Sequence, residues 1–172
     1  MIIDSHAHFV PPTLLEEIAD TAADFPSLQL MPHDTGFGFS FAGSKPTRPV
    51  SPLLSDASAR LDWMDQQQID RQVIGGWLDM FGYEMPVEDG IKWSRLINKH
   101  LQTFAAASGG RFLPLASLPM QDGAAAASVL DDAHKAGFRG VMIGTQPKGA
   151  GGVLDDPELT PFWQAADRNK SV

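Results

Sequence analysis

The chain begins MIIDSHAHFV (residues 1–10), a short apolar run followed by an acidic residue and two histidines two positions apart. Residues Met1–Ser5 are typical of a buried strand that ends at the histidines. Alternate residues of a strand point to the same side, so His6 and His8 can face one ion. Imidazole nitrogen suits zinc and similar first-row metals. We therefore predict a metal site at the carboxyl end of this strand, with Asp4 either orienting an imidazole or serving as a structural acid.

Apolar strands and helical patterns alternate along the rest of the chain. Strands are predicted at 71–78, 111–118 and 138–145, and helices at 13–20, 56–70, 87–108, 122–137 and 156–170. This alternation is typical of an α/β fold with a parallel sheet and helices outside it. A doubly wound open sheet and a (β/α)₈ TIM barrel both fit it.

The turn after the first strand separates these two architectures. Residues 6–12 read HAHFVPP, which is not the Gly-rich phosphate loop of a nucleotide-binding open sheet. This argues against an open sheet that binds a nucleotide. About four βα units cannot close a barrel, so on the barrel interpretation the chain would be the N-terminal part of one.

Residues 25 to about 55 interrupt the alternation. They are rich in Gly, Pro, Ser and Phe, and the stretch FGFSFAG (37–43) predicts a short hairpin. An irregular segment of this length is usually functional. We interpret it as a small insertion after strand 1 that lies over one end of the fold.

Composition excludes several classes of function. The formal net charge is -8, which disfavours binding to nucleic acid or to an anionic membrane surface. There is no cysteine, so disulfides, thiolate metal sites and a Cys nucleophile are excluded. No stretch approaches the roughly 20 apolar residues of a membrane span, and the start does not read as a signal peptide. A cytoplasmic location is the resulting expectation.

The remaining histidines do not complete a metal site on sequence grounds. His100 and His134 fall in predicted helices beside lysines, where a solvated helix face is expected. His33 falls in the insertion, where a solvated loop is expected. A catalytic zinc site usually takes three protein ligands and a water, so further ligands are expected from strands that the chain does not contain.

Four stretches carry a resemblance to a known family: MIIDSHAHF, LDWMDQQQIDRQVI, RFLPLASLPMQD and AGFRGVMIGT. The chain resembles the amidohydrolase-related family, a group of metal-dependent hydrolases, and within it the aminocarboxymuconate semialdehyde decarboxylase-like branch. The resemblance runs along residues 1–172, which would be one partial barrel domain lacking its C-terminal half. It implies a distorted (β/α)₈ barrel and a divalent metal, usually zinc, with His6 and His8 as the first two ligands. The family's third ligand, catalytic histidine and metal-binding aspartate would all lie beyond Val172.

Substrate-binding candidates come from the insertion and from the end of the second strand. Arg48 matches the place where this branch keeps an arginine for a substrate carboxylate, and its planar fork suits that role. Trp77 and Phe81 could form the wall of a site for a planar substrate, although packing beneath the insertion explains them equally well.

The resemblance implies a metal-dependent decarboxylase that acts on an unsaturated or aromatic carboxylic acid. A hydrolase of a lactone or amide on the same scaffold remains an alternative, because the early motif serves both reactions. A third reading is a catalytically incomplete, truncated barrel that is inactive alone, binds metal weakly and associates through exposed strand edges. The expected partner is a small carboxylic acid, and a homodimer is left open.

Overall fold

A computed structural model describes residues 1–21, 24–34, 36–148 and 151–172. Its main sheet has three parallel strands in the order β1-β4-β5, namely β1 (Ile3–His8), β4 (Arg71–Gly75) and β5 (Phe112–Pro114). The helices are α1 (Pro12–Thr21), α2 (Pro52–Ser55), α3 (Ala57–Gln66), α4 (Val87–Ala107), α5 (Gly123–Lys135) and α6 (Thr160–Asn169), with short 3₁₀ helices η2 (Leu78–Met80) and η3 (Pro157–Leu159). Parallel strands separated by helices confirm the predicted α/β class. Among the described residues, no helix combines the length and apolar composition needed to cross a membrane.

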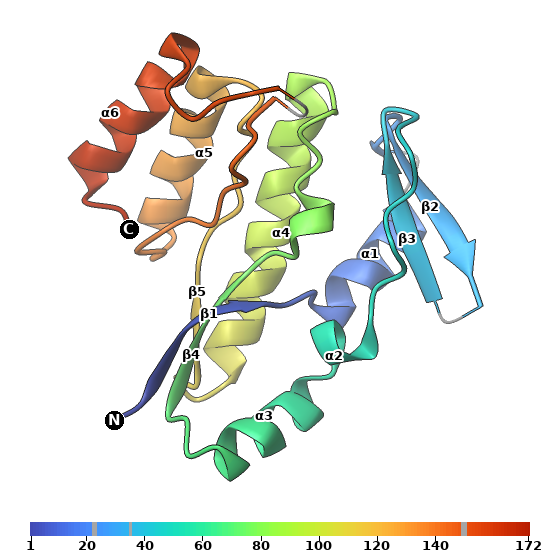
Figure 1. Cartoon of the computed structure of the whole chain (residues 1–172), viewed down its shortest axis with the longest axis vertical. Helices are drawn as coiled ribbons and strands as arrows, with labels where there is room; N and C mark the ends of the chain where they lie inside the picture. The colour runs from blue at the N-terminus through green and yellow to red at the C-terminus, as the bar shows by residue number, and fades with distance from the viewer. Residues whose placement is uncertain (22–23, 35, 149–150) are drawn as a thin grey trace.

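Helix α4 is the element around which the others are arranged (Figure 1). Helices α5 and α6 lie side by side on one flank of α4, and α1 lies on the other. An antiparallel hairpin of β2 (Leu28–His33) and β3 (Gly36–Phe41) stands beyond α1, away from the main sheet. This hairpin falls within the predicted insertion, as expected.

The detail of the hairpin differs from the prediction. Residues 37–43 were expected to turn back on themselves, but Gly36–Phe41 is a single strand whose partner is Leu28–His33. The alternation of Phe37, Phe39 and Phe41 is that of one strand with a buried face. Phe39 and Phe41 are buried and stack with ring centroids 5.9 Å apart.

The strand predicted at 138–145 is reduced to a single parallel bridge between Ala116 and Val141. Ala116 donates to Gly140 and accepts from Met142, as a ladder requires. The next rung would need the amide of Gly144, but that amide donates to the hydroxyl of Tyr83. The prediction of a full strand is wrong because this backbone group is engaged elsewhere.

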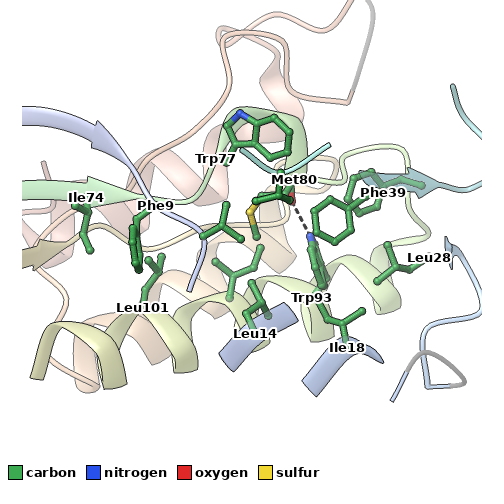
Figure 2. Close-up of a cluster of buried hydrophobic side chains, with 14 of the residues drawn as sticks. Phe9, Leu14, Ile18, Leu28, Phe39, Ile74, Trp77, Met80, Trp93 and Leu101 are labelled. Carbon is green, nitrogen blue, oxygen red and sulfur yellow. Dashed lines mark hydrogen bonds between the residues drawn. The ribbon is translucent and has the colours of Figure 1, made fainter. Parts of the chain in front are cut away.

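The hydrophobic core joins the sheet, α1, α4 and the hairpin (Figure 2). Trp93 of α4 is fully buried, and its ring lies 5.8 Å from that of Phe39 and 5.9 Å from that of Phe41. Its indole nitrogen donates a 2.7 Å hydrogen bond to the carbonyl of Met80. One side chain therefore attaches both the hairpin and η2 to α4.

The expectation that His100 lies on a solvated face is wrong. His100 is buried where α1 packs on α4, with Nδ1 2.8 Å from the hydroxyl of Thr13 and Nε2 2.9 Å from a carboxylate oxygen of Glu17. Lys99 reaches the same carboxylate. His134 is half-buried in the last turn of α5, and His33 is exposed as expected.

The Glu17 carboxylate should make stability depend on pH. Hydrogen bonding from Lys99, and after it from His100, lowers the pKa of Glu17 below its ordinary value of 4.5. A depressed folded pKa stabilises the fold above pH 4.5, and this contribution is lost as the pH falls through the folded value. Glu17→Gln should therefore cost at most about 1 kcal/mol at pH 7, because the pair is partly exposed, and less at pH 3. Urea unfolding at both pH values measures this, with the exposed Glu16→Gln as the matched control. An equal cost at both pH values would contradict it.

A second prediction concerns the segment that follows β5. The side-chain amide of Asn98 donates to the carbonyl of Ser117 (3.0 Å) and accepts from its amide (2.7 Å), in the buried interior. Asn98→Ala leaves both backbone groups without these partners, which should lower the free energy of unfolding by about 2–4 kcal/mol. Thr103→Ala, at an exposed position of the same helix, should change it by less than about 0.5 kcal/mol. Equal effects of the two substitutions in urea unfolding would refute a stabilising role of the hydrogen bonds between Asn98 and Ser117.

Candidate functional site

The two histidines predicted as metal ligands both lie within β1, at its carboxyl end. Their ring centroids are 5.0 Å apart and the ring planes are nearly perpendicular. The pairing of β1 with β4 shifts register between Asp4 and Ala7, so β1 has one extra residue there. Such a bulge re-aims the side chains beside it. The strand ends at His8, beyond the predicted Met1–Ser5. The rings of His6 and His8 lie side by side at its carboxyl end.

Hydrogen bonding sets the tautomer of the neutral His8 ring. Its Nδ1 lies 2.9 Å from the carbonyl oxygen of Gly76. A carbonyl can only accept, so in the neutral ring the proton is on Nδ1 and the lone pair is on Nε2. Metal-ligating histidines commonly donate their second ring N–H to a backbone carbonyl in this way. The His8 side chain therefore fits a divalent metal at Nε2.

Asp4 supports the backbone near the histidines. One of its carboxylate oxygens accepts the backbone amide of His6 (3.3 Å), and the other accepts the side-chain amide of Gln72 (2.8 Å). These bonds hold the bulge rather than an imidazole ring. An indirect role of Asp4 toward a metal stays a prediction.

Arg60 of α3 extends this polar network to the end of β1. Its guanidinium donates to the carbonyl of His8 and to the side-chain oxygen of Gln72, both at 2.9 Å, and lies over the ring of Phe9. Burial lowers the pKa of Arg60. The half-buried guanidinium of Arg60 thus helps to fix the backbone at His8.

A cavity of about 730 Å³ opens beside His6. Its wall comes from three further segments: residues 41–47 of the insertion, 78–84 after β4, and 143–146 after the bridge at Val141. Parallel βα folds keep their sites at the carboxyl ends of the strands, which is where these segments lie. The cavity is therefore the candidate binding site.

Aromatic side chains form part of the cavity wall. Phe81 and Tyr83 stack with ring centroids 5.4 Å apart, and the Tyr83 hydroxyl accepts the amide of Gly144. Burial raises the pKa of Tyr83 far above its ordinary value, so the hydroxyl stays protonated at neutral pH. Of the predicted substrate-binding residues, Phe81 lines the cavity.

Arg48 and Trp77 lie beside the cavity rather than on its wall. The guanidinium of Arg48 sits 5.6 Å from the centre of the buried Trp77 ring. It also donates two hydrogen bonds to Asp79, Nε to Oδ2 at 3.0 Å and a terminal nitrogen to Oδ1 at 3.3 Å. The fork expected to meet a substrate carboxylate thus faces a carboxylate of the same chain.

Sequence reasoning missed Asp79, Tyr83 and Lys45, which all line the cavity. Asp79 and Tyr83 stand beside Trp77 and Phe81 in the stretch GGWLDMFGY, directly after a predicted strand. That position was the available signal for them. Lys45 is three residues before Arg48 and offered no comparable signal.

The described ranges contain no group of three or more His, Asp or Glu side chains placed to hold a metal ion. The site as described thus offers two histidine donors. The parallel strand–helix order and the histidine pair at the end of β1 define an α/β protein built like part of a (β/α)₈ barrel.

Comparison with known proteins identifies the family. The family model described as amidohydrolase matches residues 3–171, and the chain belongs to this family.

The chain is also similar to individual proteins. The 2-amino-3-carboxymuconate-6-semialdehyde decarboxylase of Dictyostelium discoideum is 26% identical over 125 residues, which is 70% of this chain and 33% of that protein. The crystal structure of IDCase from Metarhizium anisopliae has a TM-score of 0.73 at 19% identity, over 100% of this chain and 49% of that one. A dihydroxybenzoic acid decarboxylase from a Polaromonas species, solved with manganese and 2-nitroresorcinol, has a TM-score of 0.70 at 22% identity, over 99% and 47%.

These alignments show the extent of the likeness. The chain spans about half the length of the similar solved structures and a third of the Dictyostelium relative. Its fold is that of one part of these larger chains, which agrees with the predicted partial barrel.

Loss of one histidine should weaken metal binding. His8→Ala removes the nitrogen that Gly76 orients, so the dissociation constant for Zn²⁺ or Mn²⁺ should rise at least about tenfold in calorimetry. His33→Ala, in the exposed hairpin, is the matched control and should leave binding unchanged. Equal binding by both variants would remove β1 from the metal site.

Proposed function

We propose that the protein carrying this chain is a metal-dependent decarboxylase acting on an unsaturated or aromatic carboxylic acid. The observation that supports this most is the histidine pair of β1, of which His6 lines a cavity with an aromatic face and His8 lies beside it. Membership of the amidohydrolase family and the decarboxylases among its relatives point the same way.

His6 and His8 would hold the divalent metal, which when bound polarises substrate oxygens and activates water. Zinc is the ion we propose first, because the donors are imidazole nitrogens. The manganese of the Polaromonas relative makes both ions worth testing. The remaining ligands are proposed to come from outside the described residues, since these residues offer no third side chain.

The described side chains have their own tasks in this proposal. Phe81 would lie against the plane of the substrate, where its stacking with Tyr83 keeps the ring in place. Gly76 keeps the His8 lone pair turned outward through the Nδ1 bond. Arg48 would act from beside the cavity through its ion pair with Asp79, and Trp77 by supporting the Arg48 guanidinium.

The reaction breaks the bond between the carboxyl carbon and the neighbouring carbon of the substrate. The electron pair stays on the carbon that is left, which takes up a proton, and carbon dioxide departs. We propose that the proton donor lies outside residues 1–172, as the resemblance implies. The cytoplasmic location and a homodimer also stay predictions.

Product analysis tests the proposal. The full protein, supplied with Zn²⁺ or Mn²⁺ and a set of hydroxybenzoates and unsaturated dicarboxylic acids, should release carbon dioxide from at least one of them. The His6→Ala and His8→Ala variants should lose at least about 100-fold in rate, because a ligand is lost outright. Hydrolysis of lactones or amides without release of carbon dioxide would overturn decarboxylation in favour of the hydrolase alternative.

A further inference from the structure

An internal ion pair between Arg48 of the insertion and Asp79 of η2 stands at one edge of the cavity, which we call its mouth. Arg48 and Asp79 make two parallel hydrogen bonds, the fork geometry with which an arginine binds a free carboxylate. The Arg48 side chain is 74% exposed, whereas that of Asp79 is 26% exposed and lines the cavity. The guanidinium is therefore reachable from solvent, and its best-placed hydrogen bonds are already used.

The carboxylate side of the pair is held firmly. The amide of Met80 donates to the carbonyl of Trp77 (3.0 Å), and the carbonyl of Met80 accepts the indole of Trp93 (2.7 Å). Met80 and Trp93 are fully buried. The short helix η2, and with it Asp79, is thus fixed to the core.

The arginine side is also anchored. The amide of Thr47 donates to the carbonyl of Phe39 (2.8 Å), and the amide of Val50 donates to that of Phe37 (3.0 Å). The Trp77 ring lies beneath the guanidinium. The backbone on both sides of the pair is thus held in place and the Trp77 ring supports the guanidinium, so the pair costs less freedom on forming than one between two unanchored segments.

Formal charges at the mouth cancel. Lys45 and Glu84 line the cavity together with Asp79, and Arg48 stands next to it. These side chains are two cations and two anions, so they add no net positive charge to that of a metal at His6 and His8 for a second carboxylate of a substrate. Such a carboxylate would also compete with Asp79, which is tethered at high effective concentration.

We infer that Asp79 is a specificity-determining residue: by holding Arg48, it makes the site prefer acids with one carboxylate over acids with two. This inference rests on the proposed carboxylic acid substrate. It assigns Arg48 a role opposite to the one expected from sequence, since the internal pair withholds the guanidinium from the ligand.

Equilibrium binding of two unreactive probes tests this in the full, metal-loaded protein. Benzoate carries one carboxylate and benzene-1,3-dicarboxylate carries two. The wild type should bind the dicarboxylate no more tightly than benzoate. Asp79→Asn frees Arg48, so the affinity for the dicarboxylate relative to benzoate should rise about three- to tenfold at low salt.

Arg48→Gln leaves Asp79 unpaired, so it should shift the ratio in the opposite direction. The double variant should return close to the wild-type ratio, because it lacks both charges. Because the two single variants have opposite expected shifts, either one still tests the inference if the other folds poorly. An unchanged ratio in Asp79→Asn, or a gain retained in the double variant, would overturn the inference.

Glu84→Gln is the matched control. Glu84 is exposed, lines the same cavity and makes no ion pair with any other residue of the described ranges. Its substitution removes the same charge without freeing an arginine. A gain equal to that of Asp79→Asn would attribute the effect to net charge alone and would refute the role of the pair.

The binding ratio does not depend on turnover, so the two proposals fail separately. A shifted ratio without release of carbon dioxide would reject the decarboxylase and retain the role of Asp79. Release of carbon dioxide with an unshifted ratio would do the reverse.

Discussion

The hydrogen bond from the Trp93 indole to the Met80 carbonyl is the contact on which the cavity depends (Figure 2). Trp93 lies on α4, Met80 ends η2, and the same indole ring packs against Phe39 of the hairpin. Two walls of the cavity, from segments far apart in sequence, are thereby attached to one helix. A buried indole needs a partner for its N–H, so the contact is both a packing and a positional constraint.

The histidine end of the site is held by a different set of contacts. The bulge in β1 is supported by Asp4, and Arg60 donates to the carbonyl of His8. Gly76 orients the His8 ring. The positions of the two histidines are therefore determined by the small sheet and α3, whereas the aromatic side of the cavity is determined by α4 and the hairpin. The two parts can vary independently, which is consistent with a family that hosts many reactions on one scaffold.

Much of the fold was predictable from local pattern. The alternation of strands and helices is a property of adjacent residues, and so is the cap of α3, where Asp56 accepts the amide of Ala59 at 2.9 Å. The strand at 138–145 and the solvated face of His100 were not predictable in this way. The first was shortened by the hydroxyl of Tyr83, and the second was buried by α1, through contacts between segments more than 60 positions apart.

The same distinction between local pattern and long-range contacts applies to the candidate site. The nearness of His6 and His8 was predictable from their i, i+2 spacing in one strand, and the place of Phe81 at the cavity from its position after a strand, whereas the bulge beside His6 was not. The ion pair of Arg48 with Asp79 could not be predicted, because it joins a loop residue to a residue of η2 that lies 31 positions further along the chain.

An arginine in a suitable loop is therefore incomplete information about what it binds. A carboxylate of the same chain, fixed on buried supports, satisfies a guanidinium as well as a ligand does, and it remains in place when the ligand leaves. Whether such an arginine attracts an acid or is withheld from it depends on the residue opposite. At this cavity the residue opposite is Asp79, and the selectivity of the mouth follows from the pair rather than from Arg48 alone.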